Sequence, residues 1–302
     1  MKSMKKRIMI IVGMVLVIIV VSSIVRYNLY IRAAKEQLAT YDPMVKSVKT
    51  SYGTMSFIDE GTGEAILVAH GLFGGYDQGY SSMKDTIGNY RIIAPSRFGY
   101  VGTDFPKKST MKDQAKAYSE LLDDLGIKKV YILGTSAGGS VAMTFALEFP
   151  ERVKGLILYC SGAPGAVKPN EEDVKEYLGV PPFLCNDFFL WMAGPVMEKA
   201  MNMSDEVWLS VFPVSQRRLG VINDGYEANA DMSKNFDEYP LENIECPVLV
   251  LHSEDDTTAP YANIKETVPR FQNCTFIHFK DGAHMMKGHQ KEVEKALGEF
   301  VK

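Results

Sequence analysis

The sequence predicts an α/β fold built on a mostly parallel sheet with helices on both faces. Short, wholly apolar runs recur along the chain, helical stretches separate them, and each run has the length of a strand buried on both faces. Strands that alternate with helices form parallel sheets, because each helix carries the chain back across the sheet. We therefore expect one large α/β domain rather than two.

The predicted elements follow in order. Residues 46–51 and 54–59 flank Tyr52-Gly53 and read as an antiparallel hairpin at one edge of the sheet. Thr110–Leu125 reads as a helix, because it opens with a Thr110-x-x-Asp113 capping box and stops at Gly126. The apolar runs that we expect to form buried strands are 65–69, 90–94, 130–133, 155–159, 248–251 and 275–279.

One interval, from about 163 to 240, breaks the alternation because it has no convincing strand. It contains both tryptophans of the chain, Trp191 and Trp208, with several phenylalanines and methionines. We interpret it as a helical cap or lid inserted between two strands. An ordinary small helical core is the alternative interpretation.

The first 35 residues differ from the rest of the chain in charge and hydropathy. They hold seven basic residues and no acid, and they enclose Ile8–Val25, a stretch without charge. As a helix this stretch would be about 27 Å long, close to the thickness of the bilayer hydrocarbon core. The remaining 26 basic and 37 acidic residues give a net charge of −11. We therefore predict a transmembrane signal anchor at 1–35, a tether at 36–45 and a folded domain at 46–302.

A cleaved secretory signal is the alternative to the anchor. Such a signal also begins with basic residues, but this apolar run is longer than usual and no A-x-A site follows it closely. Four basic residues precede the run and three follow it, which slightly favours an N-terminus inside the cell. We predict a single-pass membrane protein with its folded domain on the extracytoplasmic side, or else a secreted, shortened form.

The composition excludes several classes of protein. Hydrophobic residues make up 46% of the 302 and charged residues 23%, values typical of globular proteins rather than of disordered, collagenous or coiled-coil chains. A pI near 5.8 argues against nucleic acid as a partner. The four cysteines have no C-x-x-C spacing, so we expect no metal site, and no cofactor is indicated.

The strongest chemical signal is the segment Val-Tyr-Ile-Leu-Gly-Thr-Ser-Ala-Gly-Gly at 130–139. It reads as a strand that runs into Gly134-x-Ser136-x-Gly138 and then into a helix. A serine on such a strand-to-helix turn is held clear of its neighbours, and glycine permits the close crossing of backbones. The bare pattern is weak evidence, but its context makes Ser136 the candidate nucleophile; a helix N-cap is the alternative role.

Four motifs in register make the chain resemble the α/β-hydrolase family from Lys46 to Lys302. Besides the Ser136 segment they are His70-Gly-Leu-Phe-Gly-Gly75, Cys246–Pro260 and Asp281-Gly-Ala-His284. Pro95–Gly102 also looks like a family loop, although Ser96 stands where an aspartate is usual. Ser253 and Ala283 are further departures, and neither removes a reactive group. The resemblance implies a mostly parallel α/β-hydrolase sheet with a cap, and a Ser, Asp, His order of catalytic residues.

Five histidines compete for the role of general base. His284 stands in a loop just after the last predicted strand, at the edge where Ser136 also emerges, and we predict that it is the base. His289 is the reserve candidate. We expect His70 to order its glycine-rich loop, and His252 and His278 to be core residues within apolar strands.

The carboxylate that orients His284 should come from the acidic run at the end of the 248–251 strand. Glu254, Asp255 and Asp256 are the candidates. Family members carry this acid four residues before a proline, so the resemblance selects Asp256 with Pro260. Its role would be to fix the tautomer of His284 and to stabilise the imidazolium.

The resemblance also implies an oxyanion hole and a disulfide candidate. The expected donors are the backbone N–H of Ala137 and that of Leu72 or Phe73, with Leu72 favoured by the family pattern. A phosphate site at 134–139 is the competing reading, but the spacing and the following lysine that it needs are missing. Cys246 and Cys274 begin strands that are neighbours in the family order, yet we expect small buried thiols rather than a bridge.

The cap should lie above Ser136 if the family order holds. We therefore expect Phe73, Trp191 and Trp208 to contact an apolar acyl group of the substrate. A cap that only excludes water is an equal alternative.

Three functions remain open. The first is a serine hydrolase that cleaves carboxylic esters or thioesters through an acyl-enzyme on Ser136. The second uses the same residues for acyl transfer to an alcohol or for C–C bond hydrolysis. The third is a membrane-tethered binding protein without catalysis. The expected partners are a small-molecule ester and the membrane, through residues 8–25; no protein partner is evident. Dehalogenase and epoxide hydrolase chemistry would need an aspartate in place of Ser136.

Overall fold

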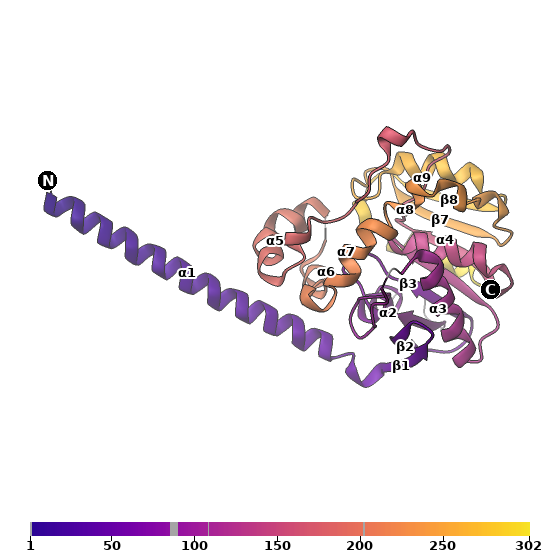
Figure 1. Cartoon of the computed structure of the whole chain (residues 1–302), viewed down its shortest axis with the longest axis horizontal. Helices are drawn as coiled ribbons and strands as arrows, with labels where there is room; N and C mark the ends of the chain where they lie inside the picture. The colour runs from indigo at the N-terminus through magenta and orange to yellow at the C-terminus, as the bar shows by residue number, and fades with distance from the viewer. Residues whose placement is uncertain (1, 85–89, 108, 202) are drawn as a thin grey trace.

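The computed structural model describes residues 2–84, 90–107, 109–201 and 203–302. It contains an eight-stranded sheet in the order β1-β2-β4-β3-β5-β6-β7-β8 (Figure 1). The first two contacts, β1 with β2 and β2 with β4, are antiparallel, and all other neighbours are parallel. The strands are β1 (Val45–Thr50), β2 (Gly53–Glu60), β3 (Ala65–Ala69), β4 (Arg91–Pro95), β5 (Val130–Thr135), β6 (Val153–Tyr159), β7 (Val248–Ser253) and β8 (Cys274–Phe279). The predicted mostly parallel α/β sheet with a hairpin at one edge is confirmed.

Helices cover both faces of the sheet, as predicted. Buried side chains of α3 (Met111–Asp124), α4 (Gly138–Glu148) and α9 (Tyr261–Thr267) pack into one core cluster. Those of α2 (Tyr76–Lys84) and α10 (Gln290–Phe300) pack into the cluster on the opposite face. The capping box predicted at the start of α3 is present in both directions. Central strands such as β3 and β7 are buried along their whole length, which is why their sequences are wholly apolar runs.

The insertion between β6 and β7 is helical. Its α-helices are α5 (Asp187–Met201), α6 (Asp205–Ser210), α7 (Arg218–Glu227) and α8 (Asp231–Lys234), and no strand is assigned to its described residues. Its Cys185, Leu190 and Trp208 belong to a small core that the insertion shares with Ala34 of the N-terminal helix and with the loop residue Phe73. We call this insertion the cap.

The N-terminal segment is a single helix, α1 (Lys2–Ala39), whose first half projects far from the sheet (Figure 1). It is the one described helix long and apolar enough to cross a membrane. Its second half packs on the cap, where Tyr30 meets Phe212 edge to face at 5.2 Å between ring centroids. Ala34 and Leu38 are buried.

The predicted tether at 36–45 is therefore not a loose linker. Residues up to Ala39 continue α1, a short 3-10 helix spans Asp42–Met44, and β1 begins at Val45. We did not foresee this because Asp42-Pro43 reads as a break, whereas the contacts of Leu38 with the domain are set by tertiary packing.

Candidate active site

Ser136 lies at the turn between β5 and α4. Its φ angle is +52°, a left-handed conformation that costs free energy in a residue other than glycine. The turn is tight because the backbones nearly touch: a Cβ on Gly138 would lie 2.0 Å from the carbonyl oxygen of Ala69, and one on Gly134 would lie 2.6 Å from Cα of Gly139. The glycines of the Gly-x-Ser-x-Gly pattern are thus required for steric reasons.

Three side chains from the carboxyl ends of β5, β7 and β8 form a hydrogen-bonded chain. His284 Nε2 lies 3.0 Å from Ser136 Oγ, and His284 Nδ1 lies 2.8 Å from Asp256 Oδ2. The other oxygen of Asp256 accepts hydrogen bonds from the backbone N–H groups of Thr258 and Ala259 at 2.8 and 3.0 Å. His284 and Asp256 are both buried. The structure therefore brings together the three residues that we predicted as catalytic.

The neighbouring acids have other partners. Asp255 is exposed and accepts a hydrogen bond from the backbone N–H of Ala283, and Glu254 contacts His278 Nδ1 at 2.8 Å. Among the three candidates, Asp256 alone reaches His284.

The other histidines have structural partners. His252 is buried beside Asp256, with Nε2 at 3.3 Å from Oδ2. His289 contacts the exposed Asp281. The prediction that His278 is a core residue is wrong, because its side chain is 43% exposed. It lies on β8, an edge strand with one open side.

The groups around His284 raise its pKa, so that this histidine takes up a proton readily. Burial alone would lower the pKa of His284, but its interactions with Cys160 and with the Asp256 carboxylate outweigh burial and raise the pKa above the ordinary value. Burial would raise the pKa of Asp256, but hydrogen bonds from His252 and His284 lower it well below its usual range. Asp256 is thus an anion at neutral pH.

The loop after β3 faces Ser136. A Cβ on Gly71 would lie 3.2 Å from Cβ of Ser136, and Phe73 has a φ angle of +59°. The backbone N–H groups of Leu72 and Ala137 donate no hydrogen bond to the residues that the structure describes. These are the two groups expected to form the oxyanion hole. His70 orders the loop as predicted: Arg97 donates its backbone N–H to His70 Nε2 at 2.9 Å, which leaves Nδ1 to donate to the Gly71 carbonyl.

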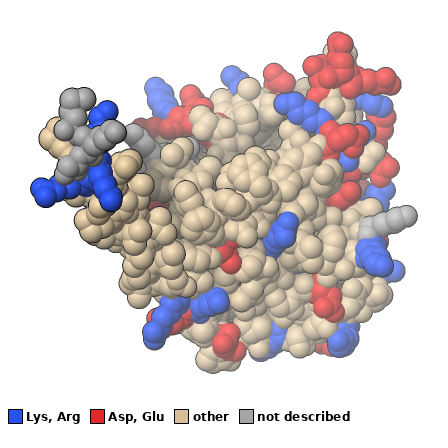
Figure 2. All heavy atoms as spheres, turned by 60° about the vertical axis from the view of Figure 1, so that its left-hand side comes forward, with Lys and Arg blue, Asp and Glu red and all other residues tan. Residues whose placement is uncertain are grey.

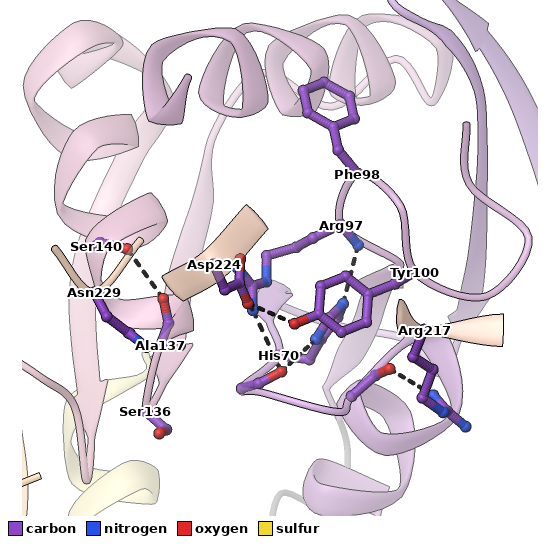
Figure 3. A network of polar contacts seen from close by, with 12 residues as sticks. His70, Arg97, Phe98, Tyr100, Ser136, Ala137, Ser140, Arg217, Asp224 and Asn229 are labelled. Carbon is purple, nitrogen blue, oxygen red and sulfur yellow. Dashed lines mark hydrogen bonds and ion pairs between the residues drawn. The ribbon is translucent and has the colours of Figure 1, made fainter. Parts of the chain in front are cut away.

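Two buried ion pairs join the sheet domain to the cap, and we did not predict either. Figure 3 shows the residues of the first pair, Arg97 and Asp224. The Arg97 guanidinium binds both oxygens of Asp224 on α7, at 2.6 and 2.5 Å, and Asp224 also accepts from Tyr100. Arg217, next to α7, binds both oxygens of Asp77 on α2 and the carbonyl of Gly74. All four charged side chains are at most 4% exposed. The cap is therefore fixed to the loop after β4 through Arg97, and to the start of α2 and the loop before it through Asp77 and Gly74.

A cavity of about 550 Å³ opens beside Ser136 and His284. Phe73 and Trp208, two of the three residues that we expect to contact the substrate, line it. Trp191 does not: its ring packs against Tyr27 of α1, at 5.6 Å between centroids. Sequence reasoning also missed that α1 supplies part of the wall, through Ala34, Gln37 and Leu38, and that Tyr41, just after α1, also lines the cavity.

Metal ligands and disulfides are not found in the described part of the chain. No group of three His, Cys, Asp or Glu side chains there is arranged to hold a metal ion. All four cysteines are free, including Cys246 and Cys274, which are only partly buried.

Comparisons with known proteins agree with this architecture. The family profile described as the alpha/beta hydrolase fold matches residues 64–287. The chain is 33% identical over 142 residues to the uncharacterized hydrolase YcgS of Bacillus subtilis, a match that covers 46% of this chain and 49% of that protein. It is 27% identical over 242 residues to the uncharacterized carboxylesterase nap of the same organism, with 75% and 76% coverage.

A solved structure shows the same fold. The esterase EaEST from Exiguobacterium antarcticum superposes with a TM-score of 0.64 at 18% identity, over 85% of this chain and 99% of that one. The chain spans only about half the length of the first curated relative. Because the family profile covers well over half of the chain, the protein belongs to the α/β-hydrolase family.

Proposed function

We propose that the protein is a serine hydrolase that cleaves carboxylic esters or thioesters with an apolar acyl group. The observation that carries this proposal is the Ser136–His284–Asp256 chain at the mouth of a cavity lined mainly by apolar side chains. Alkyl and aromatic parts of a substrate gain free energy by leaving water for such a cavity.

The proposed reaction has two halves. Ser136 Oγ attacks the substrate carbonyl carbon while His284 Nε2 takes the hydroxyl proton, and Asp256 stabilises the imidazolium that forms. The backbone N–H groups of Leu72 and Ala137 bind the developing oxyanion. His284 then donates its proton to the leaving alcohol or thiol. Water, activated by the same histidine, attacks the acyl-enzyme, and Ser136 recovers its proton as the acid leaves.

A fluorophosphonate probe tests the nucleophile. The wild-type chain should be labelled covalently, Ser136→Ala should not be labelled, and Ser161→Ala should be labelled as the wild type is. A folded wild-type chain that remains unlabelled would contradict the proposal and favour a binding function. A panel of esters of increasing acyl length would then give the size of the acyl group. Added alcohols separate hydrolysis from acyl transfer, since a transferase forms the new ester in preference to the free acid.

We propose further that residues 8–25 anchor the enzyme in a membrane, with the domain on the extracytoplasmic side. The helix is apolar on all sides over this stretch, and its side chains there are exposed to solvent in the isolated chain. Four basic residues precede it. Protease added outside intact cells should remove the domain, and the anchored chain should migrate at full length on a gel. Recovery of a shortened, soluble protein alone would overturn the anchor.

A further inference from the structure

The second half of α1 contacts both the cap and the cavity. Tyr27 packs against Phe188 and Trp191 of α5, with ring centroids 5.4 and 5.6 Å apart. About two turns further on, Ala34 begins the stretch of α1 that lines the cavity beside Ser136. One helix therefore connects the apolar anchor directly with the wall of the substrate cavity.

The cap carries an exposed apolar surface next to Tyr27, which we call the α5 surface. Its members are large apolar side chains that lie 38–73% exposed: Phe183, Phe188, Phe189, Met192 and Val196. Rings within it contact one another, with Phe188 and Phe189 centroids 5.8 Å apart. Contiguous apolar surface of this kind is unfavourable in water and marks a site that another phase or molecule covers.

With residues 8–25 spanning a bilayer, the position of α1 would place the α5 surface at the height of the lipid head groups. The apolar run ends at Val25, and Tyr27 lies about 3 Å further along the helix axis. The polar layer on each side of a bilayer is about 5–8 Å thick. Tyr27, Phe188 and Trp191 meet one another, and in this placement they would lie at the depth where aromatic side chains concentrate in membrane proteins.

The charge distribution fits a surface that faces lipid. Arg26 is the first charged residue after the apolar run, and with residues 8–25 in a bilayer its cation would reach the level of the lipid phosphates. Figure 2 brings the side of the molecule with α1 forward, and charged side chains are sparse over the middle of this face and gather toward its rim.

We propose that the α5 surface rests in the head-group layer of the bilayer, and that the enzyme takes long-chain ester substrates from the lipid itself. This inference rests on the proposed esterase function and on the anchor. Between lipid and cavity lies α5, which has Val196 on the exposed side and Met197 in the cavity wall. An acyl chain has about 14 Å to travel along α1, from the end of the apolar run to Ala34, and apolar side chains of α1 and α5 cover this distance.

The two tryptophans allow the contact with lipid to be measured without any activity. Trp191 belongs to the α5 side of the cap, whereas Trp208 is 3% exposed and faces the cavity. The full chain is reconstituted in phosphatidylcholine vesicles whose acyl chains are brominated near the head group. We expect strong fluorescence quenching of Trp191 in the Trp208→Phe variant and weak quenching of Trp208 in the Trp191→Phe variant. Absent or equal quenching would overturn the proposal.

Aspartates introduced on the α5 surface and away from it test the route of the substrate. Val196 and Val167 are 73% and 76% exposed, but only Val196 lies on the α5 surface. The test variant Phe189→Asp/Val196→Asp should lose about tenfold in kcat/KM on a long-chain ester dissolved in vesicles, because a phenylalanine no longer enters the lipid. It should keep wild-type rates on a short, water-soluble ester. Val167→Asp should match the wild type on both substrates.

The outcomes separate this inference from the proposed function. An equal loss on both esters, or no loss on either, would overturn the proposed route from the lipid. A wild-type chain that hydrolyses neither ester would refute the esterase function, while the quenching result would still decide whether the α5 surface meets lipid. Quenching of Trp191 without a selective loss would leave the anchor intact and overturn the claim about the substrate.

Discussion

At the scale of single residues, the site depends on which of several similar side chains lies at the right strand end. Asp255 and Asp256 are adjacent in the sequence, yet Asp255 accepts a hydrogen bond from a backbone N–H while Asp256 reaches His284. The difference arises because Asp256 turns inward, where Thr258 and Ala259 hold its second oxygen. The identity of the acid is therefore a matter of backbone geometry as much as of chemistry.

Replacing each aspartate by asparagine should separate their roles. Asp256→Asn should lower kcat about 10⁴-fold, because the amide no longer holds the Nδ1–H tautomer of His284. Asp255→Asn should remain within about threefold of the wild type, since the amide oxygen still accepts the N–H of Ala283. Steady-state kinetics on one soluble ester measures both. The reverse order of effects would assign the acid to Asp255.

The pH dependence of kcat/KM should report the raised pKa of His284. The base has to be neutral to take the proton of Ser136, so activity should increase as pH rises through this pKa and fall as pH drops below it. Because the Asp256 carboxylate and Cys160 raise the pKa, the midpoint of the acid limb should lie above about 6.5, the ordinary value of histidine. A midpoint below that value would contradict the assigned electrostatics.

At the scale of elements, the strands and helices with a strong local sequence pattern could be predicted, whereas contacts between segments far apart in the sequence could not. The strands and α3 follow from apolar runs and a capping box that are local in sequence. By contrast, Arg217 and Asp77 are 140 residues apart, and nothing in either neighbourhood indicates that they pair. The wrong prediction for His278 has a similar cause, because an apolar run predicts a strand but does not tell whether that strand lies at an open edge of the sheet.

The ion pair between Arg217 and Asp77 should be essential to the attachment of the cap. Arg217→Met alone leaves the Asp77 carboxylate buried without its partner and should lower the free energy of unfolding by about 3–5 kcal/mol. The double variant Arg217→Met/Asp77→Leu should recover much of that loss, because no uncompensated charge remains. Guanidinium titration of the detergent-solubilised full chain, followed by circular dichroism, measures both. A single variant as stable as the wild type would show that this pair contributes little.

At the scale of the whole molecule, α1 is part of the enzyme as well as its anchor. The sequence indicated a membrane segment from its apolar run, but it did not indicate that residues 27–34 pack on the cap or that Leu38 and Tyr41 pack on the sheet domain. The first half of α1 is apolar on all sides, and this pattern does not reveal that the second half buries a stripe, that is, a row of side chains along one face. Tyr30, Ala34 and Leu38 form such a stripe, with spacings of four residues.

Enlarging a side chain of this stripe should change the choice of substrate. Ala34→Trp should shorten the preferred acyl chain and raise KM for long-chain esters about tenfold, because the indole occupies part of the cavity beside Ser136. Short esters should be hydrolysed at nearly the wild-type rate. Lys35→Trp, one position along on the exposed side of α1, is the control and should leave the chain-length profile unchanged. Identical profiles for both variants would contradict a wall formed by α1.

The continuity of α1 also constrains how its length can vary. Each residue of an α-helix advances the axis by about 1.5 Å and turns it by about 100°. One residue added within Ile8–Val25 only lengthens a cylinder that looks the same from every side. One residue added between Tyr27 and Ala34 would turn the stripe away from the cap, so insertions there are tolerable only in multiples that restore the helical phase, about seven residues. The length of Ile8–Val25 can thus vary by single residues. The two turns between Tyr27 and Ala34 must instead keep their helical phase relative to the cap.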